Sequence, residues 1–325
     1  MTQHTLSIRD LSVHYRTERG MLRALRHVDL DIPARSIVGI VGESGCGKST
    51  LTSAILRLLP DNAHIPNGRI EFEGGDLLRL GESQMRALRG TRISMVFQDP
   101  MSSLNPVLRI GRQMTDIQYR DRAGASEKKQ RSLGMLENVR IPDPRARFAQ
   151  YPHHFSGGMK QRISIAMALQ ARPALLIADE PTTALDATLE VQIIGLLKEL
   201  QRELGCSILF ISHHLGVIAE LCERVVVMYA GEVVEEGATA DVFRRPAHPY
   251  TERLLACDPA RIRQKTRELP TIAGEIPDLV ELGGGCVFRA RCAEREEVCG
   301  ARRPDWAEVA PQQRARCHLR AARSG

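Results

Sequence analysis

The residues best suited to chemistry form one glycine-rich loop, Gly42-Glu43-Ser44-Gly45-Cys46-Gly47-Lys48-Ser49. Its glycines allow successive backbone N–H groups to converge on phosphate oxygens. An apolar run at 36–41 precedes the loop and a helical pattern follows it, which is the context that this motif requires. The helix also directs the positive end of its dipole at the loop. We therefore expect Lys48 to contact the β and γ phosphates of a nucleotide and the Ser49 hydroxyl to coordinate Mg²⁺.

Two adjacent acids, Asp179 and Glu180, follow the apolar run 175–178. This run predicts a strand that is buried on both faces. An aspartate at the tip of such a strand can hold Mg²⁺ directly or through water, and the next glutamate can polarise an attacking water. The alternative is a solvated strand end, which explains the pair less well, because two adjacent carboxylates at the end of a buried strand require a cation or a catalytic role.

A second anion site is predicted where Ser156-Gly157-Gly158 opens a helical segment. Free N–H groups and the helix dipole both favour an anion there. Glycines often begin helices, so the pattern alone is weak evidence, but its position shortly before the acidic strand strengthens it.

The elements that must position these residues follow an α/β pattern. Apolar and polar positions alternate through 6–40, which predicts antiparallel strands with one buried face. Helical patterns broken by prolines predict an inserted helical subdomain at about 99–165, and 186–204 predicts an amphipathic helix. Further buried strands are predicted at 36–41, 93–97, 175–178, 207–212 and 225–229. The periodicity weakens after Pro246, so we predict an ATPase domain at 1–250 and a C-terminal extension at 251–325.

The composition of the 325 residues is that of an ordinary globular protein, with 43% hydrophobic and 26% charged residues. A net charge of +6 allows contact with nucleic acid or an anionic membrane, but no dense Lys/Arg block occurs outside the tail. Aromatic residues make up 4%, which argues against base stacking as the main activity. No apolar run reaches the roughly 20 residues that span a bilayer, and the first residues lack a signal-peptide pattern. We expect a cytosolic protein that meets membranes only through partners.

Four of the eight cysteines gather near the end of the chain: Cys286, Cys292, Cys299 and Cys317. In a reducing compartment such a cluster indicates metal rather than disulfides. Four thiolates suit an iron–sulfur cluster or Zn²⁺, although the short Cys-x2-Cys spacing of zinc ribbons is absent, and free thiols are the third alternative. Five nearby arginines either offset the charge of such a site or form a solvated surface: Arg289, Arg291, Arg295, Arg302 and Arg303.

Taken together, these motifs resemble the ATP-binding subunits of ABC transporters. The signature pattern Leu-Ser-Gly-Gly-Gln of that family reads here Phe155-Ser-Gly-Gly-Met159. Gln98, at the end of a predicted strand, resembles the Q-loop glutamine, and 183–186 resembles the D-loop. His213 resembles the switch histidine that contacts the γ phosphate. His214 follows it where the family usually has Asp, and we interpret this as a local variation.

The resemblance implies a role for each matching residue. Tyr15 would stack on adenine, although a tyrosine on a strand surface is the alternative. The implied catalytic residues are Glu180, His213 and Gln98, and the implied Mg²⁺ ligands are Ser49, Gln98 and Asp179. The implied ATP contacts are Tyr15, Gly42, Ser44, Gly45, Cys46, Gly47, Lys48, Ser49 and Thr50. The residues implied to complete the site of a partner ATPase are Ser156, Gly157, Gly158 and Asp186.

Three longer segments narrow the resemblance to the oligopeptide/dipeptide/nickel importers, and most of all to their dipeptide-type D subunit: 98–106, 151–159 and His248-Pro249-Tyr250-Thr251. The resemblance implies a P-loop NTPase fold of the ABC type with an antiparallel β subdomain, an inserted helical subdomain and a small Cys-rich extension. It implies hydrolysis of ATP to ADP and phosphate, and a [4Fe–4S] cluster on the four cysteines, with Zn²⁺ as the alternative.

Membership of that group also implies partners. These are a second, paralogous ABC ATPase in a heterodimer, two integral membrane permeases and an extracytoplasmic solute-binding protein, with no nucleic acid. The protein would lie peripherally on the cytoplasmic face of the bacterial inner membrane. The cargo stays open among peptides, nickel chelates, metallophores and opines, since the ATPase never touches it. A soluble ABC ATPase of translation or DNA repair is the alternative from another class, although such proteins usually carry two cassettes or a long coiled coil.

Overall fold

The computed structural model describes residues 4–99, 103–183, 185–259 and 270–321. The chain folds as two compact units. The first unit comprises 1–5, 33–36 and 81–209, and the second comprises 6–32, 37–80 and 210–325. The predicted Q-loop residues 100–102 and the predicted D-loop residue 184 lie outside the described residues.

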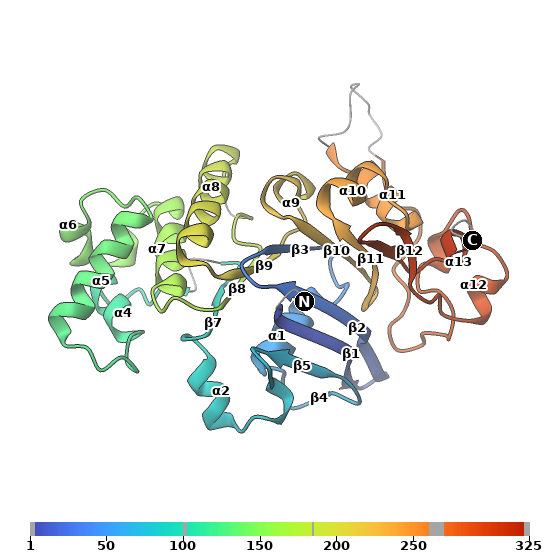
Figure 1. The fold of residues 1–325 in the computed structure, drawn as a ribbon, viewed down its shortest axis with the longest axis horizontal. Coiled ribbons are helices and arrows are strands. Elements are labelled where there is room, and N and C mark those ends of the chain that lie inside the picture. The colour runs from blue at the N-terminus through green and yellow to red at the C-terminus, as the bar shows by residue number, and fades with distance from the viewer. Residues whose placement is uncertain (1–3, 100–102, 184, 260–269, 322–325) are drawn as a thin grey trace. The chain divides into compact units, whose positions relative to one another are not determined.

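An antiparallel sheet forms one part of the second unit (Figure 1). β1 pairs with β5 in a register that places Leu6 opposite Phe72 and Ile8 opposite Ile70. These four side chains are almost fully buried, because the period of two in a strand directs alternate residues to one face. The predicted alternation in 6–40 is therefore confirmed. The strands of this sheet are β1 (His4–Thr17), β2 (Gly20–Pro33), β4 (Ala63–His64), β5 (Arg69–Phe72) and β6 (Gly75–Asp76).

A second set of strands in this unit leads into the glycine-rich loop. β3 (Ile37–Val41) is buried at every residue and pairs in parallel with β10 (Arg224–Tyr229). β10 also pairs antiparallel with the next strand, β11 (Glu232–Ala238). No pattern in the sequence predicted β11. The short strands β12 (Ala307–Ala310) and β13 (Gln313–Ala315) extend this group beyond β11.

The helices of the second unit are short. α1 (Lys48–Leu56) begins at the loop and ends where Arg57 adopts a left-handed conformation, three residues before Pro60. α10 packs against β11. The remaining helices are η1 (Leu77–Arg79), α9 (Leu215–Leu221), α10 (Thr239–Arg244), α11 (Pro249–Ala256), η4 (Arg289–Arg291), α12 (Val298–Ala301) and α13 (His318–Ala321).

The first unit combines buried strands with most of the longer helices, and α4 to α7 lie together in Figure 1. Strands are present at both predicted apolar runs, and the structure pairs β7 (Ile93–Val96) in parallel with β8 (Leu175–Asp179). β9 (Ser207–Ile211) begins in this unit and ends in the other. The helices are α2 (Glu82–Leu88), α4 (Ile110–Asp116), α5 (Ala125–Asn138), α6 (Pro144–Phe148), η2 (Pro152–His154), α7 (Gly157–Leu169) and α8 (Ala187–Leu204).

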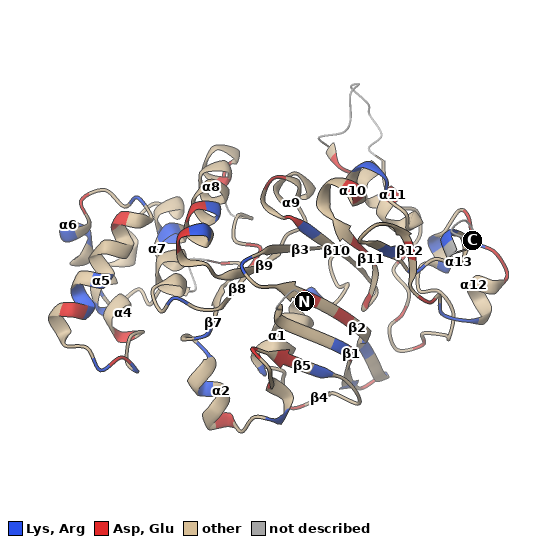
Figure 2. Cartoon of the chain, in the orientation of Figure 1, with Lys and Arg blue, Asp and Glu red and all other residues tan. Residues whose placement is uncertain are grey.

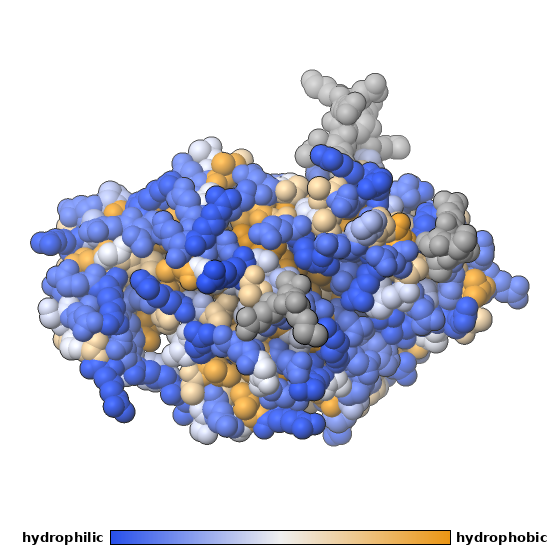
Figure 3. All heavy atoms as spheres, viewed as in Figure 1, coloured by the Kyte–Doolittle hydropathy of each residue, from blue (hydrophilic) through white to orange (hydrophobic). Residues whose placement is uncertain are grey.

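Charges of both signs are interspersed over the chain (Figure 2). On the face drawn in Figure 3, apolar residues form small separate groups among hydrophilic ones. Within the described parts of the chain, no helix has the length and apolar composition needed to cross a membrane.

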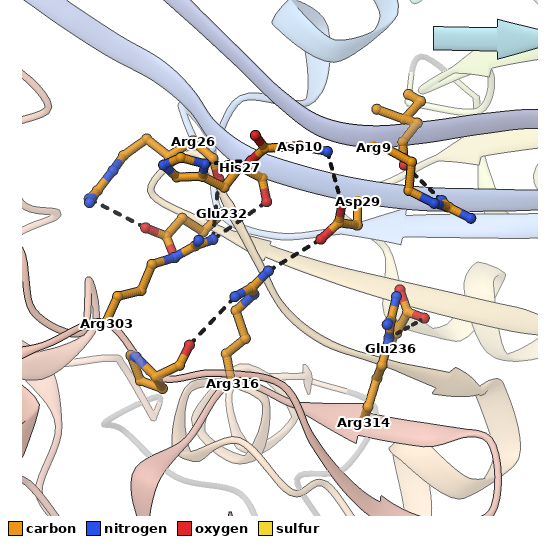
Figure 4. Close-up of polar contacts among 12 residues, drawn as sticks. Arg9, Asp10, Arg26, His27, Asp29, Glu232, Glu236, Arg303, Arg314 and Arg316 are labelled. Carbon is orange, nitrogen blue, oxygen red and sulfur yellow. Dashed lines mark hydrogen bonds and ion pairs between the residues drawn. The ribbon is translucent and has the colours of Figure 1, made fainter. Parts of the chain in front are cut away.

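Arginines of the C-terminal extension pair with acids on β2 and β11 (Figure 4). Arg303 Nε lies 2.7 Å from Glu232 Oε2, and the Glu232 side chain is only 2% exposed. Arg316 pairs with Asp29 at 3.3 Å. Hydrogen bonds between ionised groups are stronger than neutral ones, and removal of one partner of a buried pair is destabilising. These contacts therefore fasten the extension to the strands of its own unit.

Glu235 is the most enclosed acid of this attachment, with no exposed surface. One carboxylate oxygen accepts hydrogen bonds from Ala247 N–H and Gln313 Nε2, both at 2.8 Å, and the other accepts one from His248 N–H at 2.9 Å. Burial raises the pKa of Glu235, while these donors act in the opposite direction. One side chain of β11 thus holds the start of α11 and the strand β13.

Glu235→Ala should lower the free energy of unfolding by about 2–3 kcal/mol, because it leaves several buried donors without an acceptor. Denaturation by urea measures the loss. Glu308→Ala, at an exposed position of β12, is the matched control and should change stability by less than about 0.5 kcal/mol. Equal stability of the Glu235 variant and the wild type would contradict this role.

Candidate nucleotide-binding and hydrolysis site

The glycine-rich loop connects the end of β3 to the start of α1, as predicted. Gly47 has φ of 107°, and a Cβ there would lie 2.7 Å from Leu25 and 2.9 Å from the Ala24 carbonyl oxygen. Only glycine fits this approach without strain. The turn therefore packs against β2, while Ser44, Gly45 and Ser49 are exposed.

Lys48 is held inside its own loop. Its ammonium donates to the Gly42 carbonyl oxygen at 2.7 Å and to the Glu43 carbonyl oxygen at 3.1 Å. The Cys46 sulfur lies 3.7 Å away, and burial raises the pKa of this thiol. The thiol consequently stays neutral, and the positive charge of the loop is left for an anion. The loop and its lysine suit a phosphate chain in geometry and in charge.

Tyr15, the predicted adenine contact, lies beside the first turn of α1. Its hydroxyl donates to the Thr50 hydroxyl at 3.3 Å, and its ring is half-buried. The structure therefore brings together two of the predicted ATP contacts that are 35 residues apart.

Asp179 and Glu180 lie in the first unit, where β8 ends. Glu180 has φ of 47°, a left-handed conformation that costs a non-glycine residue roughly 1–2 kcal/mol. Its Oε2 accepts hydrogen bonds from Gln98 Nε2 at 3.0 Å and from the Thr183 hydroxyl at 3.1 Å. Strained residues of this kind concentrate at functional sites. The structure thus places the predicted Q-loop glutamine directly on the predicted general base.

The predicted signature residues open α7 in the same unit. Ser156 caps the helix by accepting a hydrogen bond from Met159 N–H at 3.3 Å. Gly158 is buried, and a Cβ on it would lie 3.0 Å from Leu189 of α8. Asp186 caps α8 by accepting hydrogen bonds from Thr188 and Leu189 N–H, both at 3.0 Å. These contacts fix the helix starts, and the roles of Ser156 and Asp186 toward a partner subunit stay predictions.

His213 and His214 follow β9 in the second unit, and both are exposed. The Ser212 hydroxyl accepts a hydrogen bond from His214 N–H at 2.9 Å, which shapes the turn before α9. The preference for His213 over His214 as the switch histidine stays a prediction.

The four C-terminal cysteines line one small cavity, together with the apolar side chains of Pro249, Phe288, Pro304 and Leu319. Burial raises the pKa of the Cys286 thiol to about 12 and also raises the pKa of Cys292 and Cys317. A metal would therefore be needed to stabilise thiolates there. Among the described residues, no group of three or more His, Cys, Asp or Glu side chains is arranged to hold a metal ion.

Sequence reasoning missed the partners of Glu43, the second residue of the glycine-rich loop. Arg291 was expected either to offset a metal cluster or to be solvated, but its side chain is 4% exposed and pairs with Glu43. Arg303, from the same group of arginines, pairs with Glu232. No local signal marks these pairs, because the partners are 248 and 71 residues apart.

Comparison with known proteins identifies the family of this chain. A probable peptide ABC transporter ATP-binding protein of Sinorhizobium fredii is 48% identical over 96% of this chain and 94% of the relative. The dipeptide transport ATP-binding protein of Bacillus subtilis is 47% identical over 91% of this chain and 89% of the relative. The chain belongs to the peptide-type ABC transporter ATP-binding proteins. As a member, it is an ATPase that powers transport.

Family models agree with this assignment. One described as ABC transporter matches residues 25–183, and one described as oligopeptide/dipeptide transporter, C-terminal region, matches residues 234–299. The dimeric structure of a bacterial ABC transporter cassette has a TM-score of 0.64 at 29% identity, covering 72% of this chain and 98% of that one. A Clostridium perfringens cassette protein, part of an ABC transporter complex, has a TM-score of 0.66 at 28% identity, covering 74% and 91%. The predicted ABC cassette fold is confirmed.

Glu180→Gln should leave ATP binding intact and lower the turnover rate by at least about 100-fold, because the amide cannot polarise the attacking water. Nucleotide binding and phosphate release measured on the same preparation separate the two effects. Glu203→Gln, at an exposed position of α8, should turn over ATP normally. Undiminished turnover in the Glu180 variant would disprove the assignment of the general base.

Proposed function

We propose that this protein is the ATP-hydrolysing subunit of an importer for dipeptides or oligopeptides. The proposal is carried by its similarity to peptide transport ATP-binding proteins, at 41–48% identity over 88–96% of the chain. A span of that length includes the loop at 42–49 and the acids at 179–180, and the C-terminal family model at 234–299 reaches into the extension. Nickel chelates, metallophores and opines are the alternative cargoes.

In this mechanism, Lys48 and the backbone of its loop hold the β and γ phosphates. Ser49, Gln98 and Asp179 would supply oxygen ligands for Mg²⁺, and the bound ion would offset negative charge on the γ phosphate. Glu180 accepts a proton from the attacking water, and the hydrogen bond from Gln98 at 3.0 Å orients its carboxylate. His213 contacts the γ phosphate from the turn after β9.

The working unit in this proposal is a dimer of two paralogous ATPases. A structural relative of this chain is a dimeric post-hydrolysis state bound to ADP and phosphate, with a TM-score of 0.63 at 29% identity. Ser156 and the N-terminal N–H groups of α7 would close the phosphate site of the partner, as a helix N-terminus does for an anion. The other partners are two permeases and an extracytoplasmic binding protein, so the subunit would lie on the cytoplasmic face of the bacterial inner membrane.

A groove of about 760 Å³ in the first unit is the proposed docking site for a permease. Gly90 and Thr91, which line it, precede β7, and the Gln98 side chain follows that strand. Gln170 to Arg172 line it where α7 ends, and the signature residues lie at the other end of that helix. A permease segment in the groove would therefore contact two elements that carry site residues.

Gly134→Phe should prevent co-purification with the permeases. Gly134 lies on α5, lines the groove and has open space where a side chain would be added, so the ring fills the groove without disturbing the helix. Gly195→Phe on α8 is the matched control, since a Cβ there also meets no neighbour, and it should assemble normally.

Normal assembly of the Gly134 variant would contradict this docking site. Recovery of the wild-type chain with ribosomes or DNA, and without permeases, would favour the soluble class of ABC ATPases instead.

We further propose that the four cysteines hold a [4Fe–4S] cluster. Four thiols around one cavity supply the ligand number that such a cluster needs, and the short Cys-x2-Cys spacing of zinc ribbons is absent. The cluster would supply negative charge and rigidity to the extension, and no step of ATP hydrolysis passes through it.

Protein purified without oxygen should be brown and contain about four iron atoms per chain. Cys299→Ser should lose both signals, whereas Cys257→Ser, which lies outside this cavity, should keep them. A colourless protein with one Zn²⁺ per chain would overturn the proposal.

A further inference from the structure

An ion pair connects the C-terminal extension to the phosphate loop, between Arg291 of the extension and Glu43 of the loop. Arg291 Nη1 lies 2.7 Å from Glu43 Oε2, and Arg291 Nη2 lies 3.1 Å from Glu43 Oε1. The arginine side chain is 4% exposed and the glutamate side chain 26% exposed. A bidentate pair shielded in this way is stronger and more directional than a pair in open solvent.

Every N–H group of the Arg291 guanidinium has a hydrogen-bond acceptor. Besides the pair with Glu43, Nη1 donates to the Tyr229 hydroxyl at 3.3 Å. Nη2 donates to the Ile272 carbonyl oxygen at 2.7 Å, and Nε donates to the Ala273 carbonyl oxygen at 3.1 Å. All five N–H groups of the side chain therefore have an acceptor. The position of Arg291 is set from several directions, and so is that of the carboxylate it holds.

The backbone of Glu43 is held as well. Its N–H donates to the Tyr250 hydroxyl at 2.9 Å, and its carbonyl oxygen accepts the hydrogen bond from Lys48. Phe288 of the extension supports this contact, because its ring packs edge-on against Tyr250 and Tyr229 at centroid distances of 5.5 and 5.2 Å. The amide, the carbonyl and the side chain of one loop residue thus each have a partner.

The electrostatics of the loop require such a partner. A carboxylate within a loop that collects polyphosphate repels the ligand unless a cation neutralises it. We infer that Arg291 is a positioning residue for ATP binding, which neutralises Glu43 and fixes the phosphate loop from the C-terminal extension. Arg291 directly precedes Cys292, so the turn η4 connects the cysteine-lined cavity to the loop.

The test compares nucleotide binding by full-length variants. Arg291→Met should raise the Kd for a fluorescent ATP analogue about tenfold, while kcat at saturating ATP changes less than about twofold, because the hydrolytic groups are untouched. Arg303→Met is the control, since it breaks another ion pair between the extension and its unit, the one with Glu232. It should bind the analogue as the wild type does.

A second substitution separates charge neutralisation from general loosening of the extension. Adding Glu43→Gln to Arg291→Met removes the unpaired carboxylate and should recover at least about threefold of the lost affinity. Wild-type affinity in the Arg291 variant, equal weakening in the Arg303 variant, or no recovery in the double variant would each overturn the inference. Thermal denaturation of all four proteins confirms that the compared chains are folded.

Discussion

A polyphosphate is bound where several N–H donors and a cation are held at one point, and this constraint shapes the segments around the phosphate loop. β3 is buried at every residue and hydrogen-bonds to β10, so its end is rigid. Gly47 packs on β2, and Gly231 N–H donates to the Cys46 carbonyl oxygen at 3.0 Å. The loop therefore takes its shape from segments that are distant in sequence, and Lys48 depends on that shape for its position.

The same dependence explains what could be predicted from the sequence. The loop, the buried strands and the acids at 179–180 are marked by local patterns of glycine, apolar runs and charge. The structure has a strand at each predicted apolar run, the loop between β3 and α1, and the acids at the end of β8. α8 was predicted because its apolar residues repeat at helical spacing, and the structure adds that Asp186 caps it. Short strands such as β4 and β13, with two and three residues, carry too little alternation to be recognised.

Hydrogen bonds and ion pairs between residues that are distant in sequence have no recognisable pattern in the sequence. Glu43 meets Tyr250 across 207 residues and Arg291 across 248, and any arginine can pair with any acid. The left-handed backbone of Glu180 was equally hidden, because glutamate does not favour it. The sequence revealed which residues could do chemistry, whereas the structure revealed what holds them.

The C-terminal extension belongs to this support. Glu235 and the arginine pairs attach it to β11 and β2, and Arg291 carries the attachment to the phosphate loop itself. An extension that reaches the loop can contribute to ATP affinity without supplying a catalytic group. In an importer ATPase of this kind, the extension therefore supports the phosphate loop and contributes to ATP binding.

The most direct test of this importer function is ATP hydrolysis by the whole transporter in lipid vesicles. The chain would be reconstituted with its permeases and its paralogous ATPase, and with the binding protein either empty or loaded. Stimulation of phosphate release by a peptide-loaded binding protein, and loss of that stimulation with Glu180→Gln, is the predicted result. Hydrolysis that no loaded binding protein changes would contradict the claim that this ATPase powers import.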